Sequence, residues 1–254
     1  MPNSLYFNNK DSYEDLDLLF SETPHMPFTI EDVENVPIDI RNGTVTRKLG
    51  AYKDKSINVK FKLKTDNNNY YSKIDEIIEW LNIIGDSSLI FSFNSDKKFI
   101  VKSINEVSDI QRQVAWDGEF ELTFICEPFK YPLLEDNITL ITISSIYNIG
   151  NVYSEPYFKV YCTGNLILTI NGNSITLNNI SGYIELDVLK GLVYKDIYNY
   201  SYMDSTNGKF ENLRLKRGKN IINLSNNITK VEIKIRIRYL IRYLVFYIYE
   251  KEMW

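Results

Sequence analysis

The stretch that decides the fold is GEFELTFICEPFKYP, Gly118 to Pro132, at the middle of the 254-residue chain. Apolar and polar residues alternate up to Glu127, which predicts a strand with one buried face. The inward positions of this strand are Phe120, Leu122, Phe124 and Cys126. Pro128 and Pro132 follow, and proline cannot donate a hydrogen bond to a central strand ladder. We therefore predict that one domain ends here and a second begins, with the boundary between about Pro128 and Asn148.

Cys126 has two interpretations, a reactive thiol or a small core residue. Burial on an apolar face raises the pKa of a thiol and suppresses its reactivity. Catalytic cysteines also need a nearby histidine. The single histidine, His25, belongs to an N-terminal loop between Pro24 and Pro27. We predict that Cys126 is structural, and the same holds for Cys162.

The first half of the chain predicts one helix among strands. SINVKFKLK, Ser56–Lys64, alternates strictly between apolar and polar residues, which is typical of a half-buried antiparallel strand. In Tyr70–Gly85 the apolar residues recur at helical spacing. The helical face is predicted to contain Ile74, Ile77, Ile78, Leu81 and Ile84. Ser88–Phe93 and Lys98–Ile104 are predicted to pair as a hairpin.

The second half predicts three hairpins and no helix before its last residues. The first turns at Asn171-Gly172, where both positions tolerate positive φ, and the second lies within Gly182–Asp196. The third turns at Asn226-Asn227, and its last strand continues to Tyr239. Short strands with one apolar face need a second sheet to cover them, so a β-sandwich is expected. The predicted fold class is mainly β with one helix, in two domains of residues 1–132 and 133–254.

Composition excludes several classes of function. The net charge of −4 argues against general nucleic-acid binding, which needs a dominant basic face. No stretch approaches the ~20 apolar residues of a membrane span, and the N-terminus lacks a secretory signal pattern. Two cysteines do not make a disulfide framework, so we expect synthesis in a reducing cytoplasm. The aromatic share of 14%, carried mainly by tyrosine, fits a β-rich or assembly protein.

Enzyme chemistry finds little support in the motifs. A zinc site needs about four ligands, commonly His and Cys, at recognisable spacing, and the chain has too few. No G-x-S-x-G elbow, P-loop or G-x-G-x-x-G is present. A catalytic pair of carboxylates remains an alternative, because the two residues must be close in space and need not be close in sequence. We expect no enzyme, no catalytic residue, no metal and no cofactor.

The C-terminal stretch RYLIRYLVFYIYEKEMW, Arg238–Trp254, has two interpretations. It is a last buried strand or docked helix, or it is an assembly contact, because aromatic and Arg residues are enriched at interface hot spots. The candidate contact residues are Tyr239, Tyr243, Phe246, Tyr247 and Trp254.

Several motifs follow one another in a fixed order along the chain. In the first half they are VP…RNG at Val36–Gly43, a helix ending in EWLNIIG and a strand entering FICEPFKYP. In the second half they are NIGNVYSEPYFKVYCTGNLILTING, YIELDVLKGLVYKD with Asp187, and GKFENLRLKRGKN. This order resembles the distal tail protein (Dit) family of siphovirus tail components over roughly residues 5 to 240, and VPIDIRNG departs from the family pattern by lacking a glycine after the proline.

The resemblance implies a structural role in a virion. Proteins of this family form a hexameric ring through the N-terminal domain at the tip of a phage tail. The ring joins the tail tube to tail-tip or baseplate and host-adsorption proteins. Implied partners are the chain itself, the tail tube and tape-measure proteins, the tail-associated lysin or tip protein and, in some members, receptor-binding proteins. The second domain is expected to be galectin-like, and assembly is expected in the cytoplasm of the bacterial host.

Two other functions stay in view. A carbohydrate-binding module on a tail scaffold would use exposed tyrosines of the second domain, and a cell-wall hydrolase would use unrecognised carboxylates. Galectin-like topology alone does not imply sugar binding. The second domain has no histidine, and its only tryptophan is Trp254. Direct galactoside binding is therefore not expected.

Overall fold

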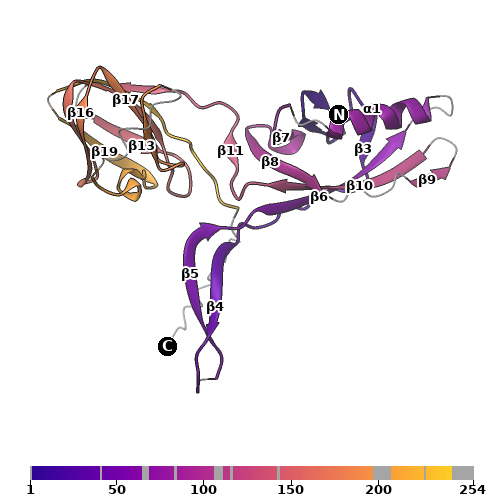
Figure 1. Ribbon diagram of the computed structural model, residues 1–254. Coiled ribbons are helices and arrows are strands. Elements are labelled where there is room, and N and C mark those ends of the chain that lie inside the picture. Colours follow the sequence, from indigo (N-terminus) through magenta and orange to yellow (C-terminus); the bar gives the residue numbers. More distant parts are fainter. Residues whose placement is uncertain are drawn as a thin grey trace, which may run out of the picture. The chain divides into compact units, whose positions relative to one another are not determined.

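The computed structural model describes residues 2–40, 42–64, 69–82, 85–105, 111–114, 117–141, 144–196, 207–225 and 227–241. The chain divides into two compact units. Unit 1 is Met1–Lys130 together with Leu240–Trp254, and unit 2 is Tyr131–Tyr239. Among the described residues α1 (Tyr70–Asn82) is the only α-helix (Figure 1). The expectation of a mainly β fold with a single helix is confirmed.

Unit 1 is built on an antiparallel sheet with the strand order β2-β1-β7-β8-β10-β6-β3, and β9 pairs with β10. Its strands are β1 (Leu5–Phe7), β2 (Lys10–Asp11), β3 (Leu18–Phe20), β6 (Lys55–Lys64), β7 (Ser88–Phe91), β8 (Lys97–Asn105), β9 (Gln111–Val114) and β10 (Asp117–Cys126). The 3-10 helix η1 (Ser92–Asn94) joins β7 to β8. A separate two-stranded sheet is made of β4 (Glu31–Pro37) and β5 (Thr44–Tyr52).

The core of unit 1 lies between this sheet and α1. The predicted inward positions of β6 and β10 are all buried, and Phe61 lies directly opposite Phe120 in the antiparallel register. Trp80 of α1 is 2% exposed, and its indole Nε1 donates a hydrogen bond to the carbonyl oxygen of Phe7 at 2.8 Å. The predicted helical face is wrong at Ile78, which is 47% exposed, because Tyr70, Ile77 and Trp80 provide the buried side instead. Ile84 lies outside the described residues.

Unit 2 contains two antiparallel sheets that share one core. The strand orders are β12-β20-β14-β17-β18 and β13-β19-β15-β16. The strands of these sheets are β12 (Ile138–Leu140), β13 (Ser144–Asn148), β14 (Tyr157–Cys162), β15 (Gly164–Ile170), β16 (Asn173–Ile180), β17 (Tyr183–Asp187), β18 (Leu192–Tyr194), β19 (Gly218–Leu224) and β20 (Ile228–Lys234), with the 3-10 helix η3 (Phe210–Leu213). The short strand β11 (Tyr131–Pro132) belongs to neither sheet. Buried residues of both sheets form a single cluster, as a sandwich requires.

Two of the three hairpins predicted in unit 2 are confirmed. Asn171 and Gly172 have φ of 50° and 87° between β15 and β16, as a two-residue hairpin turn needs. Strands β17 and β18 pair from Asp187 opposite Leu192. In unit 1 the predicted hairpin of β7 and β8 is also present.

The hairpin predicted at Asn226-Asn227 is wrong. Strand β19 belongs to the four-stranded sheet and β20 to the five-stranded sheet, so the chain crosses between sheets there. The Asn227 amide Nδ2 donates to the carbonyl oxygens of Thr163 and Asn165, at 3.2 and 2.6 Å. These hydrogen bonds attach the crossing to the connection between β14 and β15, where the chain also passes from one sheet to the other.

The last predicted strand also ends early. Strand β20 stops at Lys234, because Arg236 adopts a positive φ of 57° that leaves the extended conformation. The guanidinium of Arg236 donates to both carboxylate oxygens of Asp187, which is 2% exposed. The ion pair with the buried Asp187 thus holds Arg236 in place and sets the direction of the chain after β20.

Candidate assembly surface

The hairpin of β4 and β5, which we call the arm, is the most exposed regular element of the described chain. Its strands pair with each other and with no other described strand, and no residue in either one is buried (Figure 1). An isolated two-stranded hairpin is only marginally stable in water, and its unpaired edges and faces invite contact with another chain. The arm therefore has the exposure expected of a surface that is covered after assembly.

The two faces of the arm differ in character. On one face Val36 lies opposite Val45, and Glu34 lies opposite Arg47 with 3.9 Å between the charged groups. On the other face the Thr46 hydroxyl donates to the side-chain oxygen of Asn35 at 2.8 Å. The first face is thus aliphatic toward the tip, and the second face carries Pro37 opposite Thr44 there.

The tip of the arm, residues 36–45, concentrates exposed apolar groups. Ile38 is 45% exposed, and Ile40 is fully exposed with a φ of 67°. A left-handed conformation is unusual for a β-branched residue and costs about 1–2 kcal/mol. Gly43, with φ of 84°, takes the other left-handed position without that cost. A strained, fully exposed isoleucine suggests a role in binding rather than in folding.

The arm was not predicted as a hairpin, although the sequence contains a signal for one. Asn42-Gly43 is a strong two-residue turn signal when strands flank it. The flanking stretches EDVENVP and TVTRKLGAY are too polar to show the alternation of a half-buried strand. That polarity follows from solvent exposure of both faces.

The contact predicted at the C-terminus is described only at its beginning. Tyr239 is half-buried, and Tyr243, Phe246, Tyr247 and Trp254 lie outside the described residues. Two residues after Tyr239, the backbone of Ile241 exchanges hydrogen bonds with Thr29, at 2.9 Å from the Thr29 amide and 3.2 Å to its hydroxyl. The role of this stretch in assembly stays a prediction.

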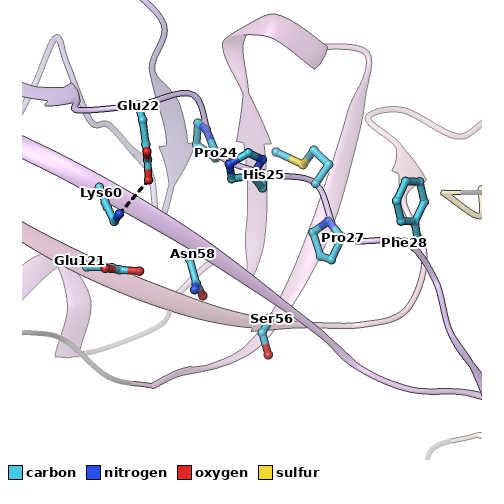
Figure 2. Close-up of a pocket in the computed structure, with 10 residues that line it drawn as sticks. Glu22, Pro24, His25, Pro27, Phe28, Ser56, Asn58, Lys60 and Glu121 are labelled. Atoms are coloured by element: carbon cyan, nitrogen blue, oxygen red, sulfur yellow. Dashed lines mark ion pairs between the residues drawn. The ribbon is translucent and has the colours of Figure 1, made fainter. Parts of the chain in front are cut away.

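A groove of about 720 Å³ in unit 1 contains the single histidine (Figure 2). The loop from Glu22 to Phe28 forms one wall, and outward side chains of β6 and β10 form the other. His25 is exposed and has no hydrogen-bond partner among the described residues. Figure 2 shows the Ser56 side chain directed away from the His25 ring.

The charged groups of this groove are paired with each other. Glu22 and Lys60 form an ion pair at 2.9 Å, which lowers the pKa of Glu22 and raises that of Lys60. A general acid or base would need the opposite shift toward neutral pH. Neither group of this ion pair therefore has the shifted pKa of a general acid or base.

The two cysteines are core residues, as predicted. Cys126 is 0% exposed, and burial raises the pKa of its thiol to about 12. Cys162 is 3% exposed, and burial also raises its pKa. Thiols in these surroundings are poor nucleophiles.

The residues that the structure describes contain neither a cluster of metal-binding side chains nor a membrane-spanning helix. Within them, no group of three or more His, Cys, Asp or Glu side chains has the arrangement to hold a metal ion. No described helix is long and apolar enough to cross a membrane.

The outward face of the five-stranded sheet in unit 2 carries a row of tyrosines. The side chains that share this face include Tyr157, Tyr161, Tyr183 and Tyr194. The ammonium of Lys159 lies 4.4 Å from the ring centroid of Tyr183, and that of Lys230 lies 4.4 Å from the ring centroid of Tyr161. Cations thus occupy one side of the rings on which a sugar would stack.

The sequence of unit 1 and the fold of the chain are similar to those of phage tail proteins. Residues 19–126 match the model of the phage tail protein RIFT-related domain family. No curated protein matches the chain in sequence. Among solved structures, the Dit protein of phage SPP1 has a TM-score of 0.67 at 12% identity, over 92% of this chain and 99% of that one. That protein is described as a paradigm of the hub adsorption apparatus in phages that infect Gram-positive bacteria. Residues 19–126 are thus similar to a phage tail protein RIFT-related domain, and the chain shares its fold with the Dit protein of phage SPP1.

Proposed function

We propose that this chain is a structural protein of a phage tail that forms a hexameric ring hub at the tail tip. Unit 1 closes the ring, and unit 2, a galectin-like sandwich, serves as an attachment domain. The ring joins the tail tube to the tail-tip or baseplate and adsorption proteins. The tape-measure protein and the tail-associated lysin are its other neighbours, and receptor-binding proteins attach to unit 2. The protein assembles in the host cytoplasm, belongs to the virion, and acts without catalysis.

The exposed arm is the observation that supports this proposal most directly. A closed ring requires heterologous contacts, in which two different patches of each copy meet. The arm supplies one such patch, because its apolar tip has no covering group among the described residues. The tail-protein domain in residues 19–126 includes the whole arm, which links the exposed element to a tail function.

Sedimentation of the full chain tests the proposal. Ile38→Lys with Ile40→Lys places two positive charges on the tip, and we expect it to abolish assembly while the circular dichroism spectrum is unchanged. Ile167→Lys is the matched control, because Ile167 is 47% exposed on β15 of unit 2. A double variant that assembles as the wild type would contradict a role for the arm in the ring.

A carbohydrate-binding role for unit 2 is the second candidate, and the outward tyrosines are the observation in its favour. The carboxylate of Glu185 raises the pKa of both Tyr157 and Tyr194, after burial as the larger cause, so these side chains are already engaged with each other. Lysines lie over the rings of Tyr161 and Tyr183. Both facts favour a protein-contact face over a sugar platform. Glycan-array binding that Tyr183→Ala abolishes would reverse this preference.

A further inference from the structure

Lys55, the first residue of β6, faces the core of unit 1. It lies on the same side of the strand as Ile57 and Val59, directly opposite Cys126 of β10. Its residue exposure is 3%, and its ammonium Nζ has no hydrogen-bond partner among the described residues. A buried ammonium without a counterion is unfavourable, so this position calls for an explanation.

A second lysine lies at the same corner of the unit. The Nζ atoms of Lys55 and Lys130 lie 6.0 and 5.3 Å from the ring centroid of Phe99, and Lys130 also donates to the Asn94 side-chain oxygen at 2.6 Å. Burial, and then the positive charge of Lys130, lowers the pKa of Lys55 to about 8. We call Lys55, Lys130 and Phe99 the basic corner.

The acidic side chains near the basic corner bind other lysines. The carboxylate of Asp54 accepts a hydrogen bond from Lys102 at 2.6 Å, and that of Asp96 pairs with Lys97. Neither carboxylate is paired with Lys55. The corner thus offers a cationic group and a hydrophobic ring to a carboxylate from elsewhere.

The tip of the arm has the complementary chemistry. Asp39 forms no ion pair or hydrogen bond with any described residue, and the exposed Ile38 and Ile40 flank it. The other acidic residues of 31–40 are Glu31, Asp32 and Glu34, and they pair with Lys48, Lys53 and Arg47, so Asp39 is the carboxylate that is left for a partner. The tip therefore presents a free carboxylate between two apolar groups.

We propose that the arm tip of one copy docks on the basic corner of the next copy, with the Asp39 carboxylate as the counterion of Lys55. The contact rests on the ring proposed above and specifies the second of its two patches. Docking requires Lys55 to turn its ammonium outward toward Asp39, which its flexible four-carbon stem allows. A charge pair that loses its water in the interface adds affinity and fixes register. In the unassembled chain the Lys55 ammonium has no counterion, so Lys55 lowers the stability of the single chain while it contributes to assembly.

A double-mutant cycle on the full chain tests the contact. Asp39→Asn and Lys55→Met are made singly and together, and the dissociation constant of the assembly is measured by sedimentation. We expect each single variant to weaken assembly about tenfold or more, and the double variant to be no weaker than the worse single one. Asp39→Asn lies on the exposed tip, so its effect does not depend on the core.

Two exposed residues outside the proposed contact provide control variants. Lys53→Met, near the base of the arm, and Asp136→Asn, an exposed carboxylate of unit 2, should assemble as the wild type. If Asp39→Asn assembles normally, or if the two effects multiply in the double variant, the proposed contact is overturned while the ring stands. If the wild type itself stays monomeric, the proposed function fails and the contact falls with it.

Discussion

Replacing Lys55 by methionine should stabilise the unassembled chain. Methionine has a similar length and no charge, so it fills the same space beside Phe99 without an unpaired ammonium. The pKa of Lys55 falls from 10.5 to about 8, a difference of about 2.5. At about 1.36 kcal/mol for each pKa unit, the charged form is disfavoured by about 3 kcal/mol, which sets the upper limit of the gain at pH 7. We expect an increase of about 1–3 kcal/mol in the free energy of unfolding.

The pH dependence of the free energy of unfolding is a second test of the buried charge on Lys55. The folded pKa of Lys55 lies below the unfolded one, so the unfolded chain binds more protons between about pH 8 and 10.5. Lys55 therefore lowers the free energy of unfolding below pH 8, and this penalty disappears as the pH rises to 10.5. Lys55→Met removes this rise, and the difference between the two proteins should shrink with increasing pH.

Urea unfolding followed by tryptophan fluorescence is a suitable assay, at a concentration where the chain is monomeric and with Trp116 and Trp254 replaced by phenylalanine in both proteins, so that Trp80 is the single tryptophan. Trp80 is 2% exposed in the core of unit 1 and reports its unfolding. Lys53→Met is the matched control, because the Lys53 side chain is 56% exposed and its loss should change stability by no more than about 0.5 kcal/mol. A Lys55→Met chain that is less stable at pH 7, or a difference that does not change up to pH 10.5, would refute the reasoning.

Three further predictions concern other parts of the molecule. Ile40→Asn should slow amide exchange in the arm, because asparagine tolerates the left-handed backbone better by about 1 kcal/mol; faster exchange would count against strain at the tip. Asp187→Asn should destabilise unit 2 by about 3 kcal/mol in thermal unfolding, because Arg236 loses its buried partner, and adding Arg236→Met should restore part of the loss. Cys126 should react with a thiol reagent only after unfolding, and fast labelling of the native chain would show that it is accessible.

Much of the fold could be predicted wherever one face of an element is buried. Residues 56–64 alternate because β6 packs one side on the core, and Asn171-Gly172 joins two neighbouring strands of one sheet. The error at Asn226-Asn227 has a physical cause. A turn of two asparagines is compatible with either a hairpin or a crossing between sheets, and only tertiary pairing decides between them.

The candidate assembly surface was harder to predict than the core. An element exposed on both faces has no periodic pattern, so the arm gave no strand signal beyond Asn42-Gly43. Lys55 could have been found, because it continues the inward parity of Ile57 and Val59 by one position. A lysine at an inward-facing position of a strand breaks the apolar pattern, and positions that break the pattern tend to be functional.

Native mass spectrometry of the full chain tests the central claim most directly. One copy has a mass of 29.8 kDa, so a ring of six copies has a mass of six times 29.8, about 179 kDa. The proposed function predicts this species as the dominant assembly of the wild type and its loss in the Ile38→Lys, Ile40→Lys double variant. A wild-type chain that stays at 29.8 kDa at every concentration would contradict the claim that this protein is a ring-forming hub.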